Sequence, residues 1–193
     1  MKIFRILKYI YFFIFGYIFA LLLYDKKYLK TRLFKHPKNI IVATGWRIAY
    51  FDFINRLITG NHRKIPFPTH PSTVLTNYKT IYFHENDLHL FQSQNCYFQS
   101  TNESTITIGE GTWIGPNVGI ITSNHDKSDL HKHMTGKDIN IGKRCWLGMN
   151  SIVLPGVTIG DNTIIGAGAV VTKSFPEGNC VLVGNPASKK NKE

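Results

Sequence analysis

Cysteine is scarce in this chain of 193 residues, which contains only Cys96, Cys145 and Cys180 and no C-x-x-C pair. Three cysteines without such a pair predict neither a disulfide framework nor a zinc site, and they suit a reducing compartment. Cys145 falls at an inward position of the repeat described below, so packing in the core accounts for it.

Acidic residues are also few, because 12 Asp and Glu stand against 23 Lys and Arg, giving a formal net charge of +11. Residues 1–38 hold nine of these basic residues and a single acid, a net charge of +8, and only +3 is left for the rest of the chain. The excess is thus concentrated in an N-terminal flank instead of covering a face, and no nucleic-acid partner is expected.

Charge is absent altogether from Tyr9 to Tyr24, a run of 16 residues rich in Phe, Ile, Leu and Tyr. As a helix it would be about 24 Å long, short of a hydrocarbon core of roughly 30 Å. Snorkelling of Lys8 and Lys26 could close the gap, so spanning the bilayer and lying embedded in it both stay open. No A-x-A-like cleavage site follows Leu23, which argues against a signal peptide. The lack of a polar face argues against the helix of a soluble protein, and membrane association is favoured.

The basic residues after this run outnumber those before it, with six between Lys26 and Lys38 and three between Lys2 and Lys8. The positive-inside rule therefore predicts that the rest of the chain lies on the cytoplasmic face of the inner (cytoplasmic) membrane.

Four segments are expected along the chain. Residues 1–38 form the membrane-associated helix with its basic flanks, and residues 39–71 a connector with a short helix over Gly45–Ile58, where apolar residues have helical spacing. Residues 72–188 form the main domain, whose first part, 72–104, has strand-like runs but no clear period. Residues 189–193 form a basic tail.

An aliphatic residue returns at every sixth position of the main domain and is usually followed by glycine. These positions are Ile108, Ile114, Ile120, Ile141, Leu147, Val153, Ile159, Ile165 and Val171. A smaller residue stands two places before most of them: Thr112, Val118, Cys145, Ser151, Val157, Thr163 and Ala169. Residues two apart face the same side of a strand, so each hexad predicts a very short strand with two inward side chains, separated by Gly, Asn and Asp turns.

Strands this short cannot bury an apolar side alone, so the hexads must stack into coils. The sequence therefore predicts a mainly β protein, a parallel β-helix. An antiparallel sheet with regular turns is the alternative, but it would not keep a strict six-residue period.

Four stretches carry a family resemblance in order as well as composition: ITIGEGTWIGPNVGI, NHD, INIGKRCWLGMNSIVLPGVTIGDNTIIGAGAVVTKSFP and GNPAS. They resemble the hexapeptide-repeat acyl-CoA O-acetyltransferases, which include galactoside, maltose, xenobiotic and surface-polysaccharide acetyltransferases. The resemblance covers roughly Pro66 to Lys190. It implies a left-handed β-helix of hexapeptide repeats, a homotrimer, and acetyl-CoA as the acyl donor.

The repeat is interrupted once. Twenty-one positions separate Ile120 from Ile141, three more than one turn of about eighteen residues, and the hexad pattern disappears over 122–138. A polar segment that interrupts regular coils must leave them as a loop, and loops on rigid scaffolds commonly carry chemistry. Acyl transfer to a hydroxyl needs a base, and a neutral imidazole serves near pH 7. By resemblance His125 is the general base, flanked by Asn124 and Asp126 as possible orienting groups.

His131 and His133 lie in the same loop. Three histidines in nine residues could bind zinc, and γ-class carbonic anhydrases share a trimeric left-handed β-helix with histidine ligands. Family ligands lie on the coils, whereas these cluster in one loop, so no metal is expected and a solvated or acceptor-contacting role is favoured for both.

The resemblance also implies the donor site, in a groove between neighbouring subunits. Trp146 would line its active-site end, Met149 and Ala167 would contact the pantetheine arm, and Thr172 and Lys173 would meet the nucleotide. Lys189 or Lys190 of the basic tail would reach phosphate. These positions also have structural explanations, since coil corners favour small residues and tail lysines are usually solvated.

The function expected from all this is transfer of acetyl from acetyl-CoA to a hydroxyl of a sugar, surface polysaccharide or lipid-linked glycan. The hydrophobic N-terminus replaces the short soluble segment of the sugar acetyltransferases, so acceptor identity does not carry over. An amino-sugar N-acetyltransferase is the main alternative, followed by a carbonic-anhydrase-like metal enzyme and a non-catalytic scaffold.

Overall fold

The computed structural model describes residues 2–36 and 40–190, except for the side chains of Lys2 and Val42. Two compact units make up the chain, Met1–Pro71 and Ser72–Glu193. The finer division into 1–38, 39–71, 72–188 and 189–193 stays a prediction, and its residues 37–39 and 191–193 lie outside the described residues.

The first unit is helical. Its elements are α1 (Lys2–Leu23), η1 (Tyr28–Lys30), η2 (Ile40–Val42) and α2 (Thr44–Thr59). The two α-helices cross at Gly16, where a Cβ would lie 2.1 Å from the Trp46 carbonyl oxygen, so only glycine permits this approach. Gly60 ends α2 in the left-handed region with φ 76°, a usual helix terminus. The short helix expected over Gly45–Ile58 is confirmed.

A buried ion pair, which the apolar pattern of α2 did not indicate, ties the helical unit together. Arg56 donates to both carboxylate oxygens of Asp52, at 3.0 and 2.8 Å, and to the carbonyls of Ile65 at 2.7 Å and Phe67 at 2.9 Å. Tyr24, just beyond α1, donates its hydroxyl to Asp52 at 2.5 Å. Such a pair persists out of water only because every charge has partners.

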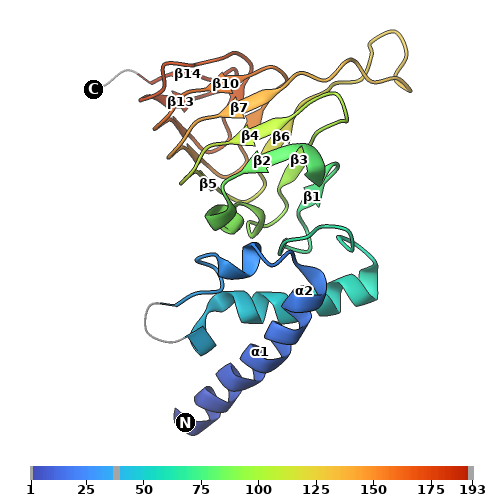
Figure 1. Cartoon of the computed structure of the whole chain (residues 1–193). Helices are drawn as coiled ribbons and strands as arrows, with labels where there is room; N and C mark the ends of the chain where they lie inside the picture. The colour runs from blue at the N-terminus through green and yellow to red at the C-terminus, as the bar shows by residue number, and fades with distance from the viewer. Residues whose placement is uncertain (1, 37–39, 191–193) are drawn as a thin grey trace. The chain divides into compact units, whose positions relative to one another are not determined.

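The second unit is a stack of coils with three flat faces (Figure 1). Sheet A contains β1 (Val74–Leu75), β3 (Tyr97–Gln99), β6 (Gly119–Ile121), β9 (Ile152–Val153) and β12 (Val170–Val171). Sheet B contains β2 (Ile81–Phe83), β4 (Ile106–Ile108), β7 (Ile139–Ile141) and β10 (Thr158–Ile159). Sheet C contains β5 (Trp113–Ile114), β8 (Trp146–Leu147), β11 (Ile164–Ile165), β13 (Val181–Val183) and β14 (Ser188–Lys189).

The strands pair in parallel between successive coils, except for the last pair. Trp146 pairs with Ile164 and Ile141 with Ile159, each 18 residues further on. The predicted fold class, mainly β with a left-handed parallel β-helix of hexapeptide repeats and an N-terminal helix, is confirmed. The first coils are irregular, as expected, because η3 (Tyr78–Thr80) and η4 (Glu85–Phe91) interrupt them.

Every hexad position predicted to face inward is buried. The aliphatic residues are at most 5% exposed and the smaller residues two places earlier at most 1%. The corners repeat with the same period, since φ is positive at Gly111, Asn117, Arg144, Asn150, Gly156, Asn162 and Gly168. Gly and Asn tolerate this conformation best, so Arg144 is the exception to the predicted turn chemistry.

The glycines that follow the aliphatic residues serve close stacking of the coils. At Gly142 a Cβ would lie 2.6 Å from the backbone nitrogen of Asp161 and 2.7 Å from the carbonyl carbon of Gly160 in the next coil. Contacts this short do not occur, so this position of the hexad is held by glycine for lack of space.

The chain closes the last coil with its own C-terminal segment. Strand β14 reverses and pairs antiparallel with β13. Val170 of β12 donates its N–H to Gly184 at 3.0 Å and accepts from the Ala187 N–H at 2.8 Å, while Gly160 donates to Phe175 at 2.9 Å. The edges of the final strands therefore have backbone partners within the chain.

Candidate active site

The loop 122–138 leaves the coil stack after β6 and returns at β7; it extends well beyond the sheets in Figure 1. Ile120 pairs with Val153, 33 residues on, whereas regular coils here repeat every 18. Fifteen residues are therefore inserted at one corner. Comparing the 21 positions between Ile120 and Ile141 with a whole turn was wrong, because these residues lie on adjacent faces and not one above the other.

Hydrogen bonds fasten the start of the loop to the preceding coil and join its two ends to each other. Thr122 donates its hydroxyl to the Gln99 carbonyl at 3.0 Å, and the Gln99 side-chain oxygen accepts from the Ser123 N–H at 3.1 Å. Ser123, which is buried, donates its hydroxyl to the Met134 carbonyl at 2.7 Å. Lys137 donates its N–H to the Thr122 carbonyl at 2.8 Å. The base of the loop is thus part of the rigid stack.

His125 is exposed, and its ring is held by the backbone of its own loop. Its Nδ1 lies 2.8 Å from the Leu130 carbonyl oxygen. A carbonyl oxygen can only accept, so Nδ1 carries the proton of the neutral ring and Nε2 keeps its lone pair. The His133 ring lies against it, with centroids 4.3 Å apart and planes 38° apart. This arrangement presents Nε2 as a proton acceptor.

The side chains of Asn124 and Asp126, considered as orienting groups, have no bond to the His125 ring among the described residues. Asp126 accepts from the Ser128 hydroxyl at 2.6 Å and the Ser128 N–H at 2.7 Å. These bonds hold the pKa of the Asp126 carboxyl below its ordinary value. The Leu130 carbonyl orients the His125 ring instead. The sequence gives no signal for this contact, because the position of a backbone carbonyl depends on the geometry of the loop.

A cavity of about 210 Å³ lies beneath the loop. Its lining residues are Ser123, Asn124, Met134, Thr135, Lys137, Leu154, Pro155 and Thr172. Leu154 and Thr172 directly follow β9 and β12, the strands stacked after β6 in sheet A. Thr172, predicted at the nucleotide end of the donor, therefore stands below the loop 122–138, at the same corner.

The predicted donor residues fall at two corners. Trp146, on β8, Met149 and Ala167 gather where sheet C turns into sheet A, with Gly168 donating its N–H to the Met149 carbonyl at 2.9 Å. Thr172 and Lys173 follow sheet A, at the corner that carries the His125 loop. Strands of sheet A separate these corners, so a single chain does not bring Trp146 to His125.

Sheet C carries an exposed pair of tryptophans, of which the sequence analysis identified only Trp146. Trp146 is 55% exposed and is paired with Trp113, which is 60% exposed. The His89 ring lies 4.2 Å from the Trp113 ring, centroid to centroid. The repeated W-I-G and W-L-G hexads were the available signal for Trp113.

The last coil carries the basic residues expected near phosphate. Lys173 lies over the Phe175 ring, with Nζ 5.8 Å from the centroid. Lys189 contacts Glu177 at 3.4 Å, so binding a phosphate there would replace an existing ion pair. Tail residues 191–193 lie outside the described residues.

Within 2–36 and 40–190, no group of three or more His, Cys, Asp or Glu side chains is arranged to hold a metal ion. His131 has its backbone N–H bonded to the Asp129 side chain at 3.1 Å, and only His133 lies against His125.

Comparison with known proteins shows that part of the β-helix unit is similar to transferases. Residues 138–173 match the family model for the bacterial transferase hexapeptide, six repeats. A galactoside O-acetyltransferase of Escherichia coli K12 is 38% identical over 112 residues, covering 55% of each chain. A putative colanic acid biosynthesis acetyltransferase of the same organism is 44% identical over 82 residues, covering 42% of this chain and 44% of the relative.

One solved structure, a galactoside acetyltransferase in complex with coenzyme A, is 21% identical with a TM-score of 0.49, covering 94% of this chain and 80% of that one. The chain spans about half the length of the curated relatives it matches.

Proposed function

On the premise that residues 138–173 are those of a hexapeptide-repeat transferase, as the resemblance predicted, we propose that this chain is an acetyl-CoA-dependent O-acetyltransferase. The observation that carries the proposal is the bond from His125 Nδ1 to the Leu130 carbonyl, because it leaves Nε2 ready to accept a proton. The acetyltransferase names of the relatives support the acyl group.

The chemistry balances with one histidine. Nε2 of His125 takes the proton of an acceptor hydroxyl while the hydroxyl oxygen attacks the thioester carbonyl of acetyl-CoA. The tetrahedral intermediate collapses by breaking the carbon–sulfur bond, and the imidazolium returns the proton to the departing thiolate. The acetyl ester and CoA leave, and His125 is again neutral.

The two corners described above support a homotrimer with shared sites. Trp146, Met149 and Ala167 lie at one corner of the coil and the His125 loop at another, so a donor that touches both groups must lie between two subunits. A closed ring of three copies presents each His125 corner to the Trp146 corner of a neighbour. The exposed tryptophan pair of sheet C is then covered.

The acceptor we propose is a hydroxyl of a surface polysaccharide or lipid-linked glycan. The relative named for colanic acid biosynthesis supports a polymeric or lipid-linked sugar, and the galactoside relative supports a sugar hydroxyl.

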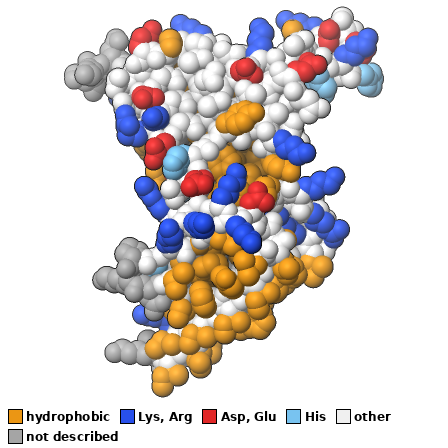
Figure 2. Space-filling view, viewed as in Figure 1, with side chains coloured by type: hydrophobic (Ala, Val, Ile, Leu, Met, Phe, Trp, Pro, Cys, Tyr) orange, Lys and Arg blue, Asp and Glu red, His pale blue; other side chains and the backbone are white. Residues whose placement is uncertain are grey.

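Membrane association through α1 is the third part of the proposal. Ile3–Leu23 is long and apolar enough to cross a membrane by length and composition, and only 11% of that window is buried, unlike the core helix of a soluble protein. Figure 2 shows hydrophobic side chains gathered over the helical unit with Lys and Arg beside them. Phe51, Leu57 and Ile58 of α2 add to this exposed surface.

The packing of α2 on α1 favours embedding at the membrane surface over spanning. Phe13, Gly16 and Phe19, in the middle and second half of α1, contact α2. A spanning α1 would carry α2 into the hydrocarbon together with Arg47, Asp52 and Arg56, which is costly. We therefore propose that both helices lie in the headgroup region of the cytoplasmic face of the inner membrane.

Release of CoA thiol from acetyl-CoA tests the catalytic proposal. Detergent-solubilised protein is assayed with oligosaccharides, lipid-linked glycans and amino sugars, and His125→Ala is expected to lower kcat by at least about a hundredfold, as loss of a general base does. His131→Ala, an exposed histidine in the same loop, is the matched control and should stay within about threefold. Equal activity of both variants would remove His125 as the base, and faster turnover of amines than hydroxyls would point to N-acetyl transfer.

Fractionation tests the membrane proposal. The full chain should stay with membranes in high salt and at alkaline pH, and it should leave them only with detergent. Recovery in the aqueous fraction without detergent would contradict it.

A further inference from the structure

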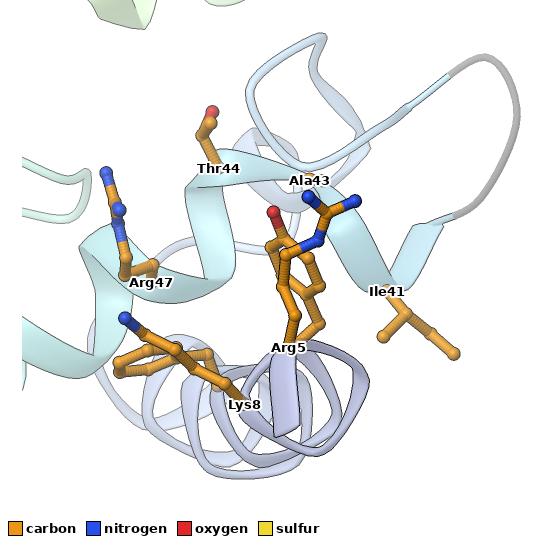
Figure 3. A pocket seen from close by; sticks show the side chains of 8 residues that line it. Arg5, Lys8, Ile41, Ala43, Thr44 and Arg47 are labelled. Atoms are coloured by element: carbon orange, nitrogen blue, oxygen red, sulfur yellow. The ribbon is translucent and has the colours of Figure 1, made fainter. Parts of the chain in front are cut away.

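The helical unit contains a cavity of about 290 Å³, and the residues that line it are distant in sequence from the hexad repeat. Its lining residues are Arg5, Lys8, Tyr9, Phe12, Ile41, Ala43, Thr44 and Arg47. In Figure 3, Arg5 and Lys8 extend from α1 toward α2, which carries Arg47. Three cationic groups from two helices therefore border one hollow.

The spacing along α1 produces this arrangement. Residues three and four apart share a helix face, so Arg5, Lys8, Tyr9 and Phe12 form one stripe. The cations stand at its N-terminal part, and the Phe12 ring packs against Tyr50 and Phe51 of α2 at 5.3 and 5.6 Å, centroid to centroid. The cavity thus has a basic mouth and an apolar wall.

The cations have no counter-charge of their own. Among residues 2–36 and 40–190, the side chains of Arg5, Lys8 and Arg47 have no hydrogen-bond or ion-pair partner. The only acids of the helical unit are Asp25 and Asp52, and Asp52 is already engaged by Arg56 and Tyr24. Three like charges held around one hollow repel each other unless an anion lies between them.

We propose that this cavity binds the phosphate group of a membrane lipid or lipid-linked glycan. Arginine and lysine donors recognise phosphate through charge-assisted hydrogen bonds, and the apolar wall of Phe12, Ile41 and Ala43 suits the first methylenes of a lipid chain. The proposal rests on the membrane association proposed above. It gives that association a chemical preference, for lipids that carry a phosphate group.

Binding of a short-chain lipid to the full chain in detergent micelles tests the proposal without needing a vesicle. Dioctanoyl phosphatidic acid is compared with dioctanoylglycerol, which lacks only the phosphate, and with inorganic phosphate, which lacks the lipid. Affinities are measured by microscale thermophoresis.

Two triple variants distinguish binding in the cavity from the general effect of the net positive charge. Arg5→Gln/Lys8→Gln/Arg47→Gln removes the basic mouth, while Lys26→Gln/Lys30→Gln/Lys64→Gln removes three exposed lysines outside it. Both lower the net charge from +11 to +8. We expect the first to weaken phosphatidic acid binding by at least about tenfold and the second by less than about threefold.

Equal losses in the two variants, or equal binding of phosphatidic acid and dioctanoylglycerol, would overturn the proposal. Inorganic phosphate binding as tightly as phosphatidic acid would assign the cavity to a soluble anion and overturn its lipid part. Circular dichroism and release of CoA thiol with a soluble sugar are measured on both variants. If the unmodified chain transfers no acetyl group, only the proposed activity is contradicted. Binding of phosphatidic acid tests the cavity independently of that activity.

Discussion

The tautomer of His125 is set by one backbone atom. The Leu130 carbonyl accepts from Nδ1, so no carboxylate is needed to orient the ring, and Nε2 stays a base as long as the loop keeps its turn. Asp126 caps that turn by accepting from Ser128, so we expect it to position His125 through the loop.

Replacing Asp126 should separate positioning from binding. Asp126→Ala removes both acceptor bonds, and we expect kcat to fall about tenfold with little change in the KM for acetyl-CoA, because a displaced base misses the hydroxyl. Asp126→Asn keeps an acceptor oxygen and should restore most of the rate. Steady-state kinetics on the three proteins decide this, and an equal loss in the Ala and Asn variants would show that the charge, not the turn, matters.

The same carboxyl predicts a pH dependence. Its pKa in the folded loop lies below the ordinary value, because Ser128 donates to the charged form. A lowered pKa favours the folded turn above the ordinary pKa and loses that contribution as pH falls through the lowered one. At neutral pH this contribution to the turn is therefore fully present. Its loss on acidification should be absent in Asp126→Asn when proteolysis of the loop is followed against pH.

At the scale of the elements, the hexads were predictable position by position. The inward residues repeat at a fixed local spacing. Ile141 and Thr163 could therefore be placed in the core without knowing which strand each pairs with or which coil lies beside it. The irregularity of the coils over 72–104 was expected, but their inward positions and the Asp52–Arg56 pair could not be assigned this way. The pair depends on contacts that no local pattern contains, such as the bond from the Tyr24 hydroxyl to Asp52, 28 residues away.

Two glycines of the coils, Gly142 and Gly119, give a contrast at this scale. Gly142→Ala places a methyl against the backbone of Asp161 and Gly160, and we expect a loss of about 1 to 3 kcal/mol in stability. Gly119→Ala, in β6, meets only Ile152 and Ile121 side-chain carbons at 3.7 to 3.8 Å and should change stability by less than about 0.5 kcal/mol. Thermal unfolding followed by circular dichroism compares the pair, and a Gly119 variant as unstable as the Gly142 variant would contradict the stacking explanation.

At the scale of the whole molecule, the proposed site needs residues from two chains. The sequence analysis assigned His125 and Trp146 to one site, but their separation at two corners of the chain follows from the order of the sheets, which no local pattern contains. A shared site makes a quantitative prediction about mixed oligomers.

His125→Ala and Trp146→Ala proteins should each be inactive alone. When they are co-expressed in equal amounts with different tags, one interface in about four joins an intact His125 to an intact Trp146, because each subunit contributes independently. Purification on both tags removes the homotrimers, and each mixed trimer keeps one intact interface of its three, so the doubly purified protein should regain about a third of the wild-type thiol release. A site contained within one chain would regain none, since every chain then carries a lesion.

The reversed strand β14 and the segment over Phe175 seal the final coil with backbone partners from the same chain. A repeat fold that is sealed at its end cannot lengthen there. New coils can enter only as insertions between existing hexads, as whole turns of about eighteen residues, whereas other lengths must leave the stack as loops. The 15-residue insertion that carries His125 is of this second kind: its length is incompatible with another coil, so the chain had to project it into solvent, where a substrate can meet it.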